Sequence, residues 1–276
     1  MKTYSLGFST CPNDTFIFYA LVNGRLNHCK LRFRERLADV ETLNRMALRR
    51  ELEVTKLSYH AFGHLVDDYV LLRSGSALGR GCGPLLVSRQ ACPPEELQDK
   101  KIAIPGKYTT AAMLLRLYAE YKNLVEMGFE KIIPAVKEGM ADAGVIIHES
   151  RFTYEKEGLA RIVDLGQWWE ETTGMPVPLG GIFARRDLGT EELAAVDSCL
   201  KESIRYAFSH KEEPMDYIRE HAQELEDEVI EKHINLYVNP FTLDLGEEGI
   251  QAVRHMLKMG YDKGLFKSYR DDFVVG

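Results

Sequence analysis

SGSALGRGCGPLLVS, residues 74–88, is the stretch that decides the predicted fold, because a glycine-rich run leads directly into an apolar strand pattern. A second stretch of the same kind, PVPLGGIFARR, occupies residues 176–186. We interpret both as segments that cross between two lobes. The sequence therefore predicts a first lobe made of 1–84 and 186–276, and an inserted second lobe made of 85–185, within the usual size range of domains.

The glycines at 75, 79, 81 and 83 do not fit a nucleotide-binding loop. A dinucleotide fingerprint lies between a strand and a helix, whereas here a strand follows. A phosphate-binding P-loop ends in Gly-Lys-Ser/Thr, which this stretch lacks. We interpret the run as a flexible connection into a new strand.

Short apolar runs alternate with helical patterns on both sides of this stretch, which predicts an α/β fold with parallel strands. Asp39 is predicted to cap a helix. From Thr190 onward the chain is predicted to be helical, with apolar stripes that indicate core faces. His221, His233 and His255 lie in that part and are interpreted as structural or surface residues. The predicted strands are 4–9, 31–36, 53–58, 69–74, 101–106, 123–129 and 143–149, after which 161–166 leads into 167–174. A ligand is expected between the lobes, at the carboxyl ends of the strands.

The charge balance argues against a nucleic-acid partner. The 276 residues include 35 basic and 42 acidic side chains, for a net charge of −7. No cluster of Lys and Arg is dense enough to neutralise a phosphate backbone. A small molecule is therefore the expected partner, and the oligomeric state is left open.

The cysteines and the apolar runs predict a soluble cytoplasmic protein. Five cysteines are scattered without ligand spacing, so neither a disulfide framework nor a metal site is expected. MKTYSLGFSTCPNDTF (1–16) lacks the apolar core of a signal peptide. No apolar run approaches the ~20 residues that span a bilayer, so no membrane association is expected.

Polar residues follow four predicted strands just before a helix begins: 9–14, which includes Asn13, then 56–58, 107–110 and 148–150. Helix N-termini present unpaired amides and a partial positive charge, so each of these four strand ends is a possible anion-binding site. Ser58, Thr109 and Thr110 can equally be plain helix caps. Lys56 is either a surface lysine or a partner for an acidic ligand. Four such ends facing one cleft indicate a binding site.

His148 follows the apolar run of GVIIHESRF (144–152) and is the candidate catalytic residue. It is either a polar residue that ends a buried strand or a general base, since imidazole titrates near neutral pH. Phe152 stands where an HExxH zinc motif needs its second histidine, and no Gly-x-Ser-x-Gly elbow is present. Glu149 either orients the ring or caps the following helix.

Six long motifs resemble the 1,4-dihydroxy-6-naphthoate synthase family of the futalosine route to menaquinone. They are GFSTCPNDTFIFYALV (7–22), DVETLN (39–44), TKLSYHA (55–61), LRSGSALGRGCGPLLV (72–87), GVIIHESRFTY (144–154) and VDLGQWWEETTGMPVPLGGI (163–182). The resemblance covers most of the chain and is weaker after Gly260. It implies a two-lobed fold like the type II periplasmic binding proteins, with two crossing strands and a cleft between the lobes.

The resemblance also implies a reaction and its residues. Cyclic dehypoxanthine futalosine is converted to 1,4-dihydroxy-6-naphthoate with loss of the sugar portion, a lyase reaction that needs no cofactor. The family's proton acceptor corresponds to His148. Its substrate-contacting positions correspond to Lys56, Leu57, Ser58, Thr110 and Ala111, and we add Thr109 and Asn13 as candidates.

Two other functions remain open at this point. A binding protein or sensor for an acidic aromatic ligand can share the fold, because function lies in the site. The chain shows neither the export signal of a transport receptor nor the helix-turn-helix domain of a regulator. The second alternative is the related chorismate dehydratase of the same pathway. The motifs around Lys56 and His148 favour the naphthoate synthase over it.

Overall fold

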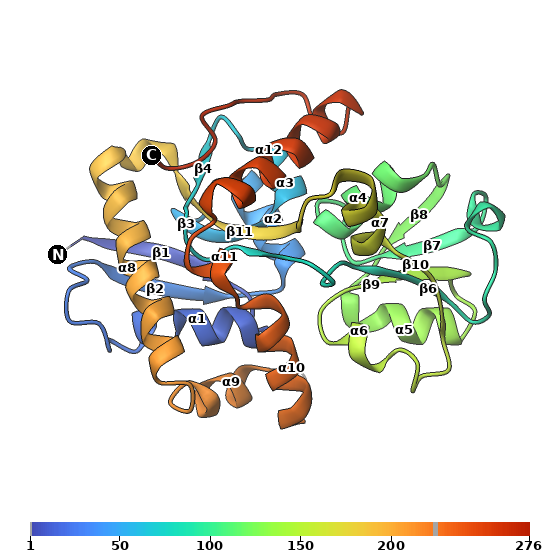
Figure 1. Cartoon of the computed structure of the whole chain (residues 1–276), viewed down its shortest axis with the longest axis horizontal. Coiled ribbons are helices and arrows are strands. Elements are labelled where there is room, and N and C mark those ends of the chain that lie inside the picture. Colours follow the sequence, from blue (N-terminus) through green and yellow to red (C-terminus); the bar gives the residue numbers. More distant parts are fainter. Residues whose placement is uncertain (1, 223–225) are drawn as a thin grey trace.

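Two β-sheets, one in each lobe, organise the computed structural model, which describes residues 2–222 and 226–276 (Figure 1). The first sheet has the order β2-β1-β3-β11-β4, with β5 paired to β11. Its strands are β1 (Thr3–Phe8), β2 (Arg32–Leu37), β3 (Val54–Ser58), β4 (Tyr69–Leu71), β5 (Ala77–Gly79) and β11 (Val177–Arg185). The second sheet has the order β10-β6-β9-β7-β8. Its strands are β6 (Leu85–Ser88), β7 (Lys101–Ile104), β8 (Asn123–Glu126), β9 (Ala143–Ile146) and β10 (Ala160–Asp164). The α/β fold with two lobes is therefore confirmed.

The prediction of parallel strands is right for part of each sheet and wrong for the rest. Strand β1 is parallel to β2 and β3, and β7 is parallel to β8 and β9. Strand β11 is antiparallel to β3, β4 and β5, and β6 is antiparallel to β9 and β10. Helical crossovers return a chain parallel to its start. Strands β6 and β11 enter their sheets from the other lobe, and they run in the opposite direction.

Strand β11 belongs to the first sheet, although the predicted division at Arg185 places it in the inserted lobe. Its residues Gly180–Ala184 pair with β3, and Figure 1 shows it running from the second lobe into the first. The apolar composition of 176–186 indicated a strand but carried no information on its partners. The second sheet thus takes its strands from 85–164 alone.

The helices of the first lobe cover both faces of its sheet. They are α1 (Pro12–Val22), α2 (Val40–Leu48), α3 (Tyr59–Gly63), α8 (Thr190–Ser209), α9 (Met215–His221), α10 (Asp227–Tyr237), α11 (Pro240–Leu243) and α12 (Gly246–Asp262). Helix α1 packs against α8, whose predicted apolar stripe from Leu193 to Ala207 is buried. The predicted cap is also confirmed, because the Asp39 carboxylate accepts hydrogen bonds of 3.0 Å from the Glu41 and Thr42 amides.

A shared hydrophobic cluster joins the two lobes. The helices of the second lobe are α4 (Thr110–Tyr118), α5 (Phe129–Lys137), α6 (Ser150–Thr153) and α7 (Leu165–Thr173), with a short 3-10 turn at Pro94–Leu97; a second such turn, Arg186–Leu188, follows β11 in the first lobe. Met113 and Leu114 of α4 belong to the same buried cluster as Phe62 of α3 and Met256 of α12. The second lobe is therefore held against the first by apolar packing as well as by the two crossing segments.

A disulfide joins Cys29 and Cys199, which the cysteine spacing did not predict. The two residues are separated by 170 positions, and their Cα atoms lie 5.1 Å apart because the loop after α1 meets α8. Spacing carries no information on a pair brought together only by tertiary packing. Disulfides persist mainly in oxidising compartments, so the cytoplasmic location stays a prediction. Within the described ranges, no helix is long and apolar enough to cross a membrane.

Candidate active site

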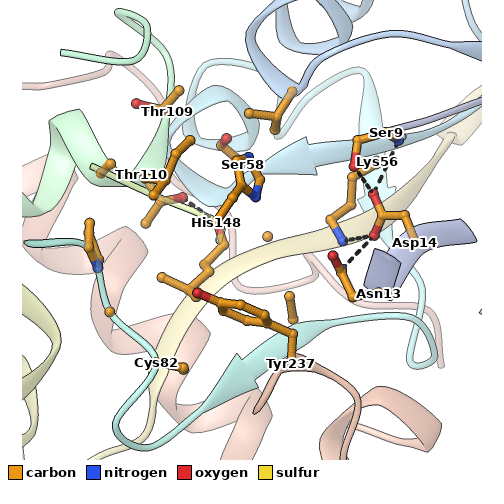
Figure 2. Close-up of a pocket in the computed structure, with 18 of the residues that line it drawn as sticks. Ser9, Asn13, Asp14, Lys56, Ser58, Cys82, Thr109, Thr110, His148 and Tyr237 are labelled. Carbon is orange, nitrogen blue, oxygen red and sulfur yellow. Dashed lines mark hydrogen bonds and ion pairs between the residues drawn. The ribbon is translucent and has the colours of Figure 1, made fainter. Parts of the chain in front are cut away.

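A cavity of about 90 Å³ lies between the lobes, where the four polar strand ends converge. Figure 2 shows side chains from the first lobe, including Lys56 and Asp14, around the same space as Thr110 and His148 of the second. Seven of the eight predicted site residues line it: Asn13, Lys56, Ser58, Thr109, Thr110, Ala111 and His148. These residues therefore lie together at one cavity, while that cavity as the active site and the role of each residue stay predictions.

Leu57 is the predicted residue that does not line the cavity. Its side chain is fully buried and belongs to the large hydrophobic cluster. Successive side chains of a strand point to opposite faces. Because Lys56 and Ser58 face the cavity, Leu57 between them faces the core.

His148 has a left-handed backbone conformation, with a φ of 57°. Non-glycine residues in this region cost about 1–3 kcal/mol and concentrate at functional sites, where the surrounding structure holds them. The turn follows β9 directly and directs the ring toward the loop after β1. Its Nδ1 lies 3.3 Å from Sγ of Cys11, and the Phe129 ring packs against it edge-on, with a centroid separation of 5.0 Å.

The electrostatics of His148 favour a neutral ring. Burial lowers the pKa of His148 below its ordinary value, and the nearby Glu149 and Asp14 carboxylates only partly oppose this effect. Burial also raises the pKa of the neighbouring Cys11 thiol, which therefore stays protonated. A neutral imidazole is the form that accepts a proton.

The lowered pKa of His148 predicts the pH profile of a reaction that uses this ring as its base. The base acts only when deprotonated, so kcat/KM is expected to fall as the pH drops through the pKa of the free enzyme. The midpoint of that acidic limb should lie below 6.5, the ordinary value for histidine. Steady-state rates measured from acidic to neutral pH check this. A midpoint above 6.5 would show that carboxylates, not burial, dominate the site.

Asp14 is the centre of a buried polar network that sequence reasoning did not assign. Its carboxylate accepts hydrogen bonds from Nζ of Lys56 at 2.6 Å, from Nδ2 of Asn13 at 2.8 Å, and from the hydroxyl and amide of Ser9 at 2.7 and 3.2 Å. The side chains of Lys56 and Asp14 are only 7% and 1% exposed. Figure 2 shows these contacts converging on Asp14. Lys56 is thus neither a surface residue nor an unpaired cation.

The three candidate hydroxyl groups differ in what they bind. Thr109 donates to the carbonyl of Gly106 at 2.8 Å and accepts from the amide of Ala112 at 3.2 Å, so it is a helix cap. Thr110 donates to the carbonyl of Leu179 at 2.5 Å and accepts from the amide of Tyr59 at 2.9 Å, which ties α4 to the first lobe.

Of these three candidate hydroxyl groups, that of Ser58 keeps its proton for a ligand. It is positioned as the cap of α3 but makes no capping hydrogen bond with its side chain. Its Oγ accepts from Nδ2 of Asn44 at 3.1 Å, and across 2–222 and 226–276 its own proton has no acceptor. The amides of Thr110 and Ala111, in the first turn of α4, are a second set of donors, since first-turn amides have no intrahelical partner.

His233 of α10 is buried and lines the cavity, so of its two interpretations, structural or surface residue, the second is wrong. It is fully buried, and its Nε2 lies 2.9 Å from Oδ1 of Asn13. Its ring stacks near that of His148, with centroids 6.2 Å apart. Sequence reasoning missed it because it lies 220 positions from Asn13 and carries no local motif.

A larger cavity of about 560 Å³ adjoins the first at His148. Ser9, Val40 and His148 line both cavities. An ion pair of 2.6 Å between Arg45 of α2 and Glu126 of β8 joins the two lobes along this outer cavity. His148 therefore stands between a small inner space and a wider outer one.

Metal-ligating side chains do not gather in the part of the chain that the structure describes: no group of three or more His, Cys, Asp or Glu residues there is arranged to hold a metal ion. The expectation of a reaction without metal or cofactor stays a prediction.

Comparisons with known proteins cover almost the whole chain. Residues 4–262 match the family model described as menaquinone biosynthesis. A 1,4-dihydroxy-6-naphthoate synthase of Thermus thermophilus is 53% identical over 96% of this chain and 96% of its own length. Another, of Streptomyces coelicolor, is 43% identical over 99% of this chain and 98% of its own length.

Solved structures share the architecture. A protein of Archaeoglobus fulgidus is 36% identical, with a TM-score of 0.90 over 96% of this chain and 98% of its own. A Candida albicans protein described as having the generic periplasmic binding protein fold is 13% identical, with a TM-score of 0.67 over 99% of this chain and 94% of its own. At that identity the likeness shows the fold alone, and it confirms the predicted two-lobed architecture.

Proposed function

This chain belongs to the menaquinone biosynthesis family, and from that premise we propose that it converts cyclic dehypoxanthine futalosine to 1,4-dihydroxy-6-naphthoate with loss of the sugar portion. The observation that carries the proposal is His148, a neutral imidazole held in a left-handed turn at an interlobe cavity. Two relatives that match nearly the full chain bear the name of this synthase. The cleavage makes the enzyme a lyase.

His148 acts as the general base in this proposal. The substrate is a carbon acid activated by a ketone, and the imidazole takes the proton from carbon. Carbon–carbon cleavage follows, and formation of the aromatic ring drives the step. A general base typically contributes ~10²–10⁴-fold to the rate.

The Ser58 hydroxyl donates a hydrogen bond to the ketone oxygen as negative charge develops there. Preorganised donors aimed at such an oxygen are often the largest single contribution to catalysis. The hydroxyl proton of Ser58 has no acceptor in the described part of the chain, which supports this role. Thr109 and Thr110 were also considered as donors from the sequence, but their hydroxyl groups already donate to backbone carbonyls.

The substrate carboxylate binds at the N-terminus of α4. Thr110 and Ala111 line the cavity at the N-terminus of α4, the positive end of the helix dipole, which favours an anion. Lys56 was the sequence-based candidate for this contact. Because the Asp14 carboxylate already neutralises its ammonium group, we assign Lys56 to holding the site together instead.

Turnover of the proposed substrate tests the function directly. The purified protein, incubated with cyclic dehypoxanthine futalosine and no added cofactor, is expected to release 1,4-dihydroxy-6-naphthoate, which chromatography and mass spectrometry detect. Chorismate serves as the second substrate, because the related dehydratase is the alternative enzyme. Binding of cyclic dehypoxanthine futalosine without turnover would support a binding protein or sensor. Turnover of chorismate alone would support the dehydratase.

A further inference from the structure

The ring of His233 has a defined tautomer, which follows from its neighbours. An ionised carboxylate only accepts hydrogen bonds, so the Asn13 group facing Asp14 at 2.8 Å is its NH₂. The carbonyl oxygen of Asn13 therefore faces His233 and lies 2.9 Å from Nε2. Because that oxygen only accepts, Nε2 of His233 carries the hydrogen.

The other ring nitrogen, Nδ1, is left as an unused acceptor. It is buried and has no hydrogen-bond partner anywhere in 2–222 or 226–276. Oε2 of Glu149 lies 4.0 Å from Nδ1, beyond hydrogen-bond distance. A buried acceptor without a partner costs about 1–3 kcal/mol. A hydrogen-bond donor on a bound ligand would remove this cost.

The position of His233 indicates where that donor comes from. The residue lines the inner cavity together with His148, and the two rings are inclined by only 22°. Burial and the neighbouring His148 hold the pKa of His233 well below its usual range, so the ring stays neutral and Nδ1 stays an acceptor. A molecule reached by His148 is thus also within reach of His233.

We propose that Nδ1 of His233 accepts a hydrogen bond from a hydroxyl group of the bound substrate, which makes His233 a specificity-determining residue. The inference rests on the proposed function, since that substrate carries hydroxyl groups on its sugar portion and its product carries them on the aromatic ring. Sites built to bind a hydroxyl discriminate strongly against analogues that lack it, because the buried protein group is then left unpaired.

Two substitutions separate a substrate contact from a structural role. In His233→Gln, the side-chain amide reaches the position of Nε2 and keeps the bond to Asn13, but no acceptor remains at the position of Nδ1. In His233→Asn, the amide oxygen occupies the position of Nδ1 and the bond to Asn13 is lost. We expect His233→Gln to raise KM roughly threefold to tenfold, the range of one hydrogen bond, and His233→Asn to raise it less.

A structural role predicts the opposite order, because only His233→Asn breaks the contact with Asn13. A larger rise in KM for His233→Asn, or no rise for His233→Gln, would overturn the proposal. The dissociation constant of 1,4-dihydroxy-6-naphthoate locates the hydroxyl group. It stays unchanged in His233→Gln if the group lies on the sugar portion, and it rises with KM if the group lies on the ring.

A spectroscopic measurement keeps the proposal testable even if both variants fold poorly. In ¹⁵N-histidine NMR of the His148→Asn variant, which is expected to bind substrate without cleaving it, the Nδ1 resonance of His233 should shift on addition of cyclic dehypoxanthine futalosine. An unshifted resonance in the saturated complex would refute the contact. Failure of the proposed function is distinguishable, because the unmodified enzyme would then show no turnover at all.

Discussion

Replacement of His148 by asparagine is expected to lower kcat by at least about a hundredfold while the protein stays folded. The lost factor is the usual contribution of a general base, ~10²–10⁴-fold. Asparagine is the informative choice because it tolerates the left-handed conformation that His148 adopts. The substitution therefore removes the imidazole without adding backbone strain. Single-turnover rates of naphthoate release, together with the melting temperature, measure both effects.

His210→Asn is the matched control for this experiment. His210 is exposed at the end of α8 and stacks on Tyr206, away from the cavity. The same chemical change there should leave kcat and KM unaltered. A His148→Asn enzyme with nearly unmodified kcat would return His148 to the role of a polar residue that ends a strand.

Lys56→Met is expected to destabilise the protein by roughly 3–5 kcal/mol, the range found when one partner of a buried ion pair is removed. The methionine retains most of the apolar stem, but the Asp14 carboxylate, which is 1% exposed, loses its countercharge. For chains of about this length, each kcal/mol of lost stability lowers the melting temperature by roughly 2–4 °C, so a fall of roughly 6–20 °C is expected. Urea unfolding followed by circular dichroism gives the free energy of unfolding directly.

Two controls isolate the charge pair. Asp14→Asn combined with Lys56→Met removes both charges, so the double variant should be more stable than Lys56→Met alone, which a double-mutant cycle expresses as a coupling energy. Lys122→Met breaks the pair with Asp99, in which both side chains are 76% exposed, and should have little effect. Equal losses of unfolding free energy in Lys56→Met and Lys122→Met would show that the buried pair contributes no more to stability than an exposed one.

Sequence patterns located most elements and most of the predicted residues that line the cavity because those signals are local. The cap at Asp39, the apolar stripe of α8 and the polar ends of β1 and β3 each depend on residues within a few positions. The features that escaped depend on distant pairs. They are the partner of Lys56, 42 positions away, the disulfide at 170 positions and the contact between Asn13 and His233 at 220. Periodicity and spacing do not encode such pairs.

Strand β11 lies between β3 and β4 in the first sheet, which has a consequence for biosynthesis. During synthesis the strands made first cannot complete their sheet until Arg185 has left the ribosome. The strands of the second sheet all come from 85–164, so their pairing is more local and is expected to form sooner. Domains usually fold in the order in which they are made. Here the inserted lobe should fold first, and the cavity is complete only when α10 brings His233 and Tyr237 to it.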